Sequence, residues 1–235
     1  MDKRNHVLVF AGTGEVGIEI CKKFLSKNFN LTFTSTSLKK IHKTKKKLSS
    51  IYKNSIIKGI YCDFLKKKSI KKIVGNFFKE NSNNKIIINC CGIFGLDGIK
   101  RISQEQVEKF LRLNTFPTMI INQEICKIKK KKQRCNIYTL GSSSCYVGVE
   151  RTISYCLSKH ALLGLIKSLN KELNKKNIWN VLVSTGTIKN KMGKKIKHLK
   201  KDTLIDMSDI SEMVFNLTKL NSAFTDEIWL KRLIP

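Results

Sequence analysis

The chain has 235 residues, of which 41% are hydrophobic, and this is enough to bury the core of one α/β domain. Lysine and arginine number 46 against 17 acidic residues, a formal net charge of +29. The lysines are spread over almost every segment, whereas a nucleic-acid interface would gather them on one face with aromatic residues between them. We therefore expect no nucleic-acid partner, and we interpret the lysine clusters at 43–47 and 129–132 as solvated helix faces or ends.

The eight cysteines form no CxxC pair, and the four histidines do not join them at zinc-like spacing, so we expect no metal site. The first apolar run, 7–11, is too short for the core of a signal peptide, and no run is long enough to span a bilayer. We expect a cytoplasmic protein with reduced thiols and no membrane partner. The adjacent cysteines Cys90 and Cys91 invite a metal or redox interpretation, but packing as small apolar residues is favoured.

Seven short apolar runs alternate with longer segments of helical period. The runs cover residues 6–11, 30–35, 55–61, 85–90, 135–141, 178–184 and 225–231. This alternation is typical of βαβ units, whose parallel strands are covered by helices on both faces. We predict a single α/β domain over residues 1–235, with a doubly wound parallel sheet of seven strands. Helix starts are predicted at Ser103, which forms a capping box with Gln106, and at Ser208.

The first run leads directly into a glycine-rich turn, AGTGEVG at 11–17, and then into an amphipathic segment. Strand, glycine turn and helix in this order are typical of a Rossmann fold, because glycines permit close backbone approach and the helix N-terminus attracts pyrophosphate. A merely structural strand-to-helix turn is the alternative. The predicted cofactor-binding residues of this turn are Gly12, Thr13, Gly14, Glu15, Val16 and Gly17.

The second run ends in STSLKK at 35–40, without the carboxylate that would hold the ribose 2′-hydroxyl of NAD. Hydroxyls and lysines suit a 2′-phosphate better, so NADP(H) is favoured over NAD(H), with contacts from Thr36 and Ser37. The alternative is that Lys39 and Lys40 occur at this position by chance, because lysine is abundant throughout the chain.

Tyr155 and Lys159 are four residues apart in a segment of helical period, so they share one helix face. A fixed ammonium favours phenolate, so we expect it to lower the tyrosine pKa from about 10 towards neutrality and to make the phenol a general acid or base. Ser142 ends a predicted strand, where parallel sheets place their ligand-binding groups, and its hydroxyl can polarise a carbonyl.

Taken in order, these elements resemble the short-chain dehydrogenase/reductase family over nearly the whole chain. The family shows a glycine-rich turn, an Asp after the third strand, an NNAG segment, an Asn in the fourth helix, a Ser and YxxxK. The matching residues here are the AGTGEVG turn, Asp63, the NCCG segment at 89–92, Asn114, Ser142, and Tyr155 with Lys159. Two departures stand out: Ala11 and Glu15 replace glycines of the usual turn, and Thr185 replaces the proline of the family's PG-containing segment.

The resemblance implies an NAD(P)H-dependent oxidoreductase that interconverts a carbonyl and a secondary alcohol by hydride transfer. Tyr155 would act as general acid or base, Lys159 would lower its pKa and hold the nicotinamide ribose, and Ser142 would orient the carbonyl. Asn114 would support a proton-relay water. The implied cofactor contacts beyond the glycine turn and the second strand are Asp63, Asn89, Cys90, Gly92, Tyr155, Lys159, Gly186 and Ile188.

Within the family, the TLGS and YxxxK arrangement is similar to that of 3-oxoacyl carrier-protein reductases, so a 3-oxoacyl thioester is the expected substrate. An acidic carrier protein could then dock on the basic residues Lys132, Arg134, Lys175 and Lys176. A reductase of a keto sugar or other small carbonyl metabolite in surface-polysaccharide synthesis is the alternative. A non-catalytic NADP-binding regulator and a nucleic-acid binder that uses the charge alone are the remaining ones.

Two further expectations concern the substrate side and assembly. Residues 192–207 are short and polar, and we expect them to form a lid over the substrate. The family often pairs its fourth and fifth helices, which implies a homodimer or homotetramer. Apolar residues of the corresponding segments could form such a face or could pack in the core: Ile120, Ile121, Ile125, Leu162, Leu165 and Ile166.

Overall fold

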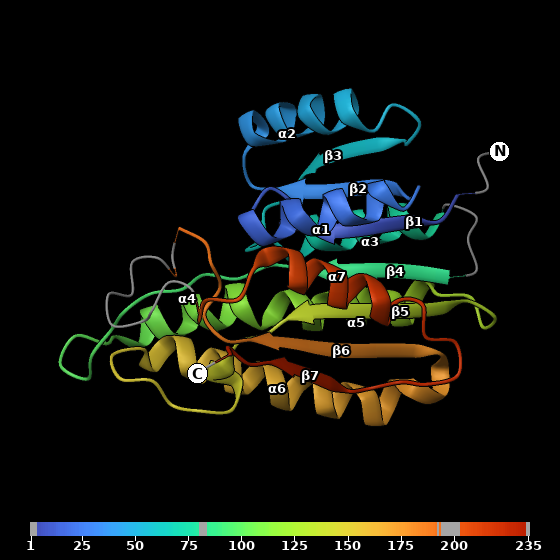
Figure 1. Ribbon diagram of the computed structural model, residues 1–235. Helices are drawn as coiled ribbons and strands as arrows, with labels where there is room; N and C mark the ends of the chain where they lie inside the picture. Colours follow the sequence, from blue (N-terminus) through green and yellow to red (C-terminus); the bar gives the residue numbers. More distant parts are fainter. Residues whose placement is uncertain (1–3, 80–83, 192, 194–202, 234–235) are drawn as a thin grey trace.

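The computed structural model describes residues 4–79, 84–191, 193 and 203–233. Its centre is a sheet of seven parallel strands in the order β3-β2-β1-β4-β5-β6-β7 (Figure 1). Each strand begins and ends within two residues of a predicted run. The strands are β1 His6–Phe10, β2 Asn30–Ser35, β3 Ile57–Tyr61, β4 Asn84–Asn89, β5 Arg134–Leu140, β6 Ile178–Thr185 and β7 Glu227–Leu230.

Helices cover both faces of the sheet, as predicted. One face carries α1 Glu15–Ser26, α2 Leu38–Ile51 and α7 Met207–Leu217. The other carries α3 Lys67–Lys79, α5 Phe116–Ile128 and α6 Ile153–Leu173, and α4 Gln104–Asn114 packs on α5 and α6. Two short 3₁₀ helices, η1 Ser143–Cys145 and η2 Asn174–Lys176, flank α6. The prediction of a doubly wound parallel α/β fold is confirmed.

The apolar strands explain why the sheet is covered twice. Successive side chains of a strand point to opposite faces. In β1, Val7 and Val9 enter the core beneath α1 and α7, whereas Leu8 and Phe10 enter the core beneath α3 and α5. A run that is apolar at every position therefore requires helices on both sides.

The order of the strands defines where ligands bind. β1 pairs with β2 on one side and with β4 on the other, so the chain reverses its direction of winding between β1 and β4. In open α/β sheets, ligands bind at such a point, outside the carboxyl ends of the strands. These ends, and the loops after β4 and β5, lie at the left edge of the molecule in Figure 1.

Two predicted helix starts need correction. Ser103 caps α4 by accepting a hydrogen bond from the Gln106 N–H, but the Gln106 side chain donates to Asp97 instead of returning to the cap. The predicted capping box is therefore only half formed. Ser208 lies inside the first turn of α7, which begins at Met207 after the N-cap residue Asp206.

The apolar residues considered for an oligomer face belong mostly to the core. Ile121, Ile125 and Leu162 have no exposed surface, and Ile120 and Ile166 are also buried. These five residues therefore offer no face to a second copy, whereas Leu165 is partly exposed, and the homodimer or homotetramer stays a prediction. Within the described residues, no helix combines the length and apolarity needed to cross a membrane. Of the predicted lid at 192–207, residues 192 and 194–202 lie outside the described residues.

Candidate active site

The glycine turn after β1 is packed tightly between its neighbours. Ala11 adopts a left-handed conformation with φ of 53°, and its N–H donates to Thr34 Oγ1 at 3.1 Å. Glycine is the usual residue for this conformation, so alanine here stores about 1 kcal/mol of strain. A Cβ atom on Gly17 would lie 2.6 Å from the Ala11 carbonyl oxygen, so only glycine allows α1 to approach the strand end this closely.

The N-terminus of α1 fits the pyrophosphate of a dinucleotide. Gly14 is the N-cap residue, and no side chain caps the helix, so the first-turn N–H groups keep the capacity to bind an anion. Glu15 places a carboxylate in this first turn, and one of its oxygens accepts a hydrogen bond from the Lys191 N–H at 3.3 Å. This acid therefore links the glycine turn to the segment after β6.

Hydroxyl groups gather at the end of β2, beside the glycine turn. Thr13 Oγ1 donates to Ser35 Oγ at 2.7 Å, and Ser37 caps α2 by accepting from the Lys40 N–H. Thr36 is exposed, as are Lys39 and Lys40 in the first turn of α2. Next to them, after β3, Asp63 is half-buried and accepts from the Leu65 N–H. The structure thus brings these predicted cofactor residues to the ends of three adjacent strands.

The turn after β4 contains the two adjacent cysteines. The buried Asn89 amide donates to Thr118 Oγ1 and accepts from the Cys91 N–H, so it holds the turn rather than facing a pocket. Burial raises the pKa of Cys90 to about 12 and that of Cys91 well above its usual range, so both thiols are protonated at neutral pH. All eight cysteines are free. These properties agree with small packed side chains.

Gly92, in the same turn after β4, leaves free space next to Asn114 and Lys159 because it has no side chain. A Cβ atom there would lie 3.2 Å from Asn114 Oδ1 and 3.8 Å from Lys159 Nζ.

Within the described ranges, no three His, Cys, Asp or Glu side chains are placed to hold a metal ion.

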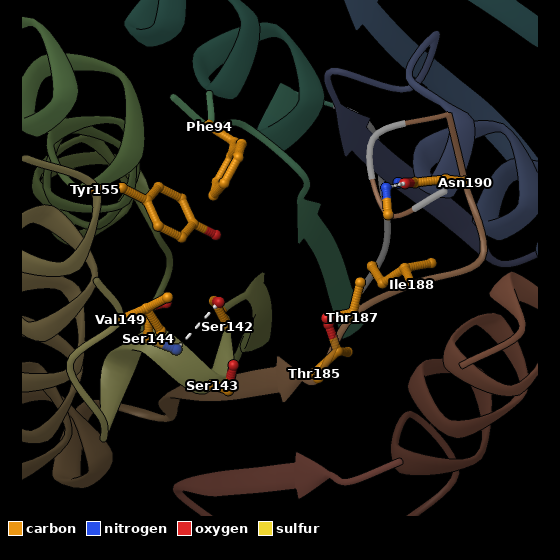
Figure 2. A pocket seen from close by; sticks show the side chains of 13 residues that line it. Phe94, Ser142, Ser143, Ser144, Val149, Tyr155, Thr185, Thr187, Ile188 and Asn190 are labelled. Atoms are coloured by element: carbon orange, nitrogen blue, oxygen red, sulfur yellow. Dashed lines mark hydrogen bonds between the residues drawn. The ribbon is translucent and has the colours of Figure 1, made fainter. Parts of the chain in front are cut away.

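Two adjoining cavities lie at the ends of β4, β5 and β6. One, of about 190 Å³, is lined by the serines Ser142, Ser143 and Ser144, by Tyr155, and by the segment after β6 (Figure 2). The other, of about 170 Å³, is lined by Lys159 and by the residues after β4. They share the lining residues Phe94, Gly141, Tyr155, Thr185, Ile188 and Asn190, and Gly186 lines the first.

Ser142 is oriented by the first turn of η1. Its Oγ accepts a hydrogen bond from the Ser144 N–H at 3.2 Å, the dashed line in Figure 2. With one lone pair engaged, the hydroxyl proton is available to donate into the cavity. The hydroxyl of Tyr155 points towards Ser142 across the cavity in Figure 2. The two hydroxyls therefore converge on one small volume in which a carbonyl oxygen can sit.

Lys159 lies one helical turn after Tyr155, on the same face of α6. Its buried Nζ donates to the Leu140 carbonyl at 3.1 Å and lies 5.9 Å from the centroid of the Tyr155 ring. Burial raises the pKa of Tyr155 to about 12, while a hydrogen bond with Ser142 opposes the shift. The lowering expected from Lys159 is not found, because desolvation by burial is the largest cause of the shift and disfavours the phenolate. At neutral pH the phenol is a proton donor.

Asn114 lies behind the cavities rather than in their walls. Its buried amide accepts from the Ile93 N–H at 2.7 Å and donates to the Ile93 carbonyl and to Ser158 Oγ. These bonds fix the loop after β4 against α6. The relay role expected of Asn114 stays a prediction.

Sequence reasoning missed Phe94, which forms a wall of both cavities. Its ring packs against that of Tyr155 in a T-shaped arrangement, with centroids 5.0 Å apart and planes at 78° (Figure 2). Val149 and Thr187 also line the larger cavity. The position of Phe94, two residues after Gly92, was an available signal, because the loop after β4 follows a matched family segment.

The basic residues expected to dock a carrier protein lie far from the cavities of the same chain. Lys132 and Arg134 are at the amino end of β5, and Lys175 and Lys176 follow the C-terminus of α6. The cavities are at the carboxyl ends of the strands, and the seven residues of β5 span about 23 Å. These four residues therefore do not rim the cavity that contains Tyr155.

The sheet is doubly wound, the glycine turn lies at its switch point, and a serine, a tyrosine and a lysine lie beside it. These features define an NAD(P)-dependent oxidoreductase acting on CH–OH or C=O groups. The family model for short chain dehydrogenases matches residues 5–201, so the chain belongs to this family. The 3-oxoacyl-[acyl-carrier-protein] reductase of Buchnera aphidicola is 28% identical over 207 residues, which cover 86% of this chain and 82% of the relative.

Solved structures show the same fold. An actinorhodin polyketide ketoreductase with NADPH superposes with a TM-score of 0.84 at 18% identity, covering 97% of this chain and 95% of that chain. ElxO with NADP bound has a TM-score of 0.84 at 22% identity, covering 97% and 96%. At this level of identity the likeness establishes the architecture.

Proposed function

We propose that the protein reduces the ketone of a 3-oxoacyl thioester with NADPH and that Tyr155 donates the proton. The observation that carries this proposal is the convergence of the Tyr155 and Ser142 hydroxyls on one cavity, with the Lys159 ammonium beside the phenol. This is the arrangement needed to protonate a carbonyl oxygen as its carbon is reduced.

Each side chain of the site has a separate role in the proposed reaction. NADPH, when bound, would supply the hydride for the carbonyl carbon and would leave as NADP⁺. Tyr155 transfers its phenolic proton to the carbonyl oxygen, which gives the secondary alcohol and leaves a phenolate. Ser142 donates a hydrogen bond to the same oxygen as negative charge develops on it. Lys159, which is near the phenol and lines the second cavity, would stabilise the phenolate and would hold the ribose hydroxyls next to the nicotinamide.

The cofactor preference rests on the end of β2. No carboxylate is there, and the exposed Lys39 and Lys40 sit in the first turn of α2, next to Thr36 and Ser37. An extra phosphate on the ribose would gain from both charges, whereas a bare 2′-hydroxyl lacks an acceptor carboxylate. Gly12 to Gly17 would hold the pyrophosphate and Asp63 the adenine. Cys90, Gly92, Gly186 and Ile188 would line the path to the nicotinamide, with Asn89 supporting the turn.

The thioester substrate is supported by the relatives and by the walls of the larger cavity. Two of the similar proteins are named a 3-oxoacyl-[acyl-carrier-protein] reductase and a polyketide ketoreductase, and the substrates in both names carry a ketone on an acyl chain. The walls next to Tyr155 include Phe94, Val149 and Ile188, which suit a methylene chain. We also infer a cytosolic location, because the spacing of the eight cysteines does not suggest a disulfide framework.

The direct test is a substrate and cofactor panel. We would follow the oxidation of NADPH and of NADH with acetoacetyl-CoA, with a longer 3-oxoacyl-CoA and with a keto sugar nucleotide. The proposal predicts turnover of the thioesters, faster with NADPH than with NADH at equal concentration. Turnover of the keto sugar alone would reassign the substrate, and NADPH binding without turnover of any carbonyl would identify a regulator instead of an enzyme.

A further inference from the structure

Asp97 is a buried carboxylate in the loop between β4 and α4, next to the catalytic helix. Its side-chain Oδ2 accepts a hydrogen bond from the Ser154 N–H at 3.0 Å and another from Gln106 Nε2 at 3.1 Å. Ser154 immediately precedes Tyr155. A side chain from a distant part of the sequence thus holds the backbone next to the proposed proton donor.

The first turn of α6 depends on this contact. The N-cap residue of α6 is Thr152, and its side chain makes no capping hydrogen bond. Free N–H groups at a helix N-terminus favour a negatively charged acceptor, which Asp97 provides from outside the helix. The Asp97 backbone strengthens the junction, because its N–H donates to the Arg151 carbonyl at 2.7 Å. Arg151 itself has a left-handed φ of 59°, so the backbone turns sharply into α6 at this point.

The same loop contacts the ring of Tyr155. Phe94, three residues before Asp97, packs edge to face on that ring, and the preceding Ile93 is held on both backbone groups by Asn114. Hydrogen bonds therefore fix the loop on either side of Phe94: Ile93 is bonded to Asn114 of α4, and Asp97 is bonded to the first turn of α6. Both the backbone and the ring of Tyr155 are constrained by one segment.

Stability alone does not account for a carboxylate at position 97. Asp97 is 7% exposed, and its Oδ1 is buried without a hydrogen-bond partner among the described residues. Burying a charged carboxylate with an unpaired oxygen opposes folding, and a neutral acceptor would avoid burying the charge. A buried polar atom without a partner in a folded protein calls for a reason other than stability.

We propose that Asp97 is a positioning residue for catalysis: by joining the β4–α4 loop to the first turn of α6, it sets the direction of the Tyr155 hydroxyl towards the substrate carbonyl. The inference rests on the proposed function of Tyr155. It assigns Asp97 no contact with substrate or cofactor.

The test compares Asp97→Ala, Asp97→Asn and the control Asn30→Ala. Asparagine can place its amide oxygen where Oδ2 lies and keep both hydrogen bonds, whereas alanine removes both. Asn30 is also buried, and its side chain accepts a backbone bond, from the Ile56 N–H at 2.9 Å, but at the amino end of β2 and far from the cavities. Asn30→Ala therefore shows the effect of losing a buried side-chain-to-backbone hydrogen bond that does not involve Tyr155.

The first readout is backbone hydrogen exchange, which needs no substrate. Asp97→Ala should accelerate exchange of the amides at 153–157, whereas Asp97→Asn and Asn30→Ala should leave them protected. The second readout is the kinetics with acetoacetyl-CoA. Asp97→Ala should lower kcat by about 10- to 100-fold, because a small misplacement of a reacting group has effects of this size. The KM for NADPH should not change, and the isotope effect with NADPH deuterated at the transferred hydrogen should increase.

Several results would overturn the inference. Unchanged exchange at 153–157 in Asp97→Ala would show that the carboxylate does not hold α6, and an equal loss of kcat in Asn30→Ala would show a general stability effect. If the wild type turns over no carbonyl, the proposed function and the positioning role in catalysis both fail, while hydrogen exchange still decides whether Asp97 holds the first turn of α6. If Asp97→Ala does not fold, Gln106→Ala removes one of its two donors and should give the same changes at a smaller size.

Discussion

Replacing Ser142 by alanine removes two hydrogen bonds with different consequences. The Oγ atom accepts from the Ser144 N–H at 3.2 Å, and in our proposal its proton is donated to the carbonyl oxygen of the substrate. Loss of one donor to a developing oxyanion lowers kcat by about 100- to 1000-fold, or roughly 2.7 to 4 kcal/mol. Loss of the η1 cap lowers the free energy of unfolding by about 1 kcal/mol. We therefore expect a large kinetic defect with a small defect in stability.

The assay is steady-state oxidation of NADPH with acetoacetyl-CoA, combined with denaturant unfolding. Ser103→Ala is the matched control, because Ser103 caps α4 in the same way, by accepting from a backbone N–H at 3.3 Å, away from the cavities. It should lose similar stability and keep its turnover. Ser142→Thr retains the hydroxyl and should recover most of the rate. If Ser142→Ala keeps kcat within about tenfold of wild type, Ser142 does not stabilise the oxyanion.

Three other predictions concern the cofactor turn and the thiols. Gly17→Ala should weaken NADPH binding strongly, because the new Cβ would lie 2.6 Å from the Ala11 carbonyl oxygen. The control Gly75→Ala, with no atom within 4 Å of its new Cβ, should leave binding unchanged. Equal affinities of the two variants in a fluorescence titration would contradict the role of the glycine turn in cofactor binding. Saturating NADPH should slow alkylation of Cys90 and Cys91 but not of the exposed Cys126, and equal labelling rates with and without cofactor would mean that the segment after β4 is misassigned. Finally, burial raises the folded-state pKa of the Cys135 thiol to about 12 against 9.0 for a free thiol, so its contribution to stability should be fully present below pH 9 and be lost between pH 9 and about 12. Denaturant midpoints that stay constant over this range would contradict that burial.

The strands and the order of the motifs could be predicted from the sequence because they depend on local patterns. Each strand is a short apolar run, and the glycine turn and the YxxxK pair are contiguous in the chain. These features needed no knowledge of which segments meet in space. The parallel sheet with helices on both faces then followed from the alternation of runs and helical segments.

The features that were missed depend on contacts between distant segments. The ring contact of Phe94 with Tyr155 and the bond from Ser154 to Asp97 join residues about 60 positions apart. The place of Phe94 after Gly92 marks its loop, but no local pattern shows which distant residue either side chain meets. The pKa of Tyr155 was misjudged for a related reason. Spacing shows that Lys159 is near, but it does not show how strongly desolvation disfavours the phenolate.

The misplaced docking residues show another limit of sequence reasoning. Lys132 and Lys175 flank the catalytic strand and helix in the chain, but both lie at the opposite end of these elements from the cavity. Nearness in sequence to a catalytic element says nothing about which of its ends carries the site.

The central claim is that Tyr155 protonates the carbonyl oxygen during hydride transfer. The most direct measurement is the kcat of Tyr155→Phe relative to wild type with acetoacetyl-CoA at saturating NADPH, together with the Kd for NADPH. Phenylalanine keeps the ring contact with Phe94 and removes only the hydroxyl. The account predicts a fall in kcat of about 100- to 10,000-fold with an unchanged Kd, the size of a lost general acid. A variant that binds NADPH normally and retains wild-type turnover would contradict it.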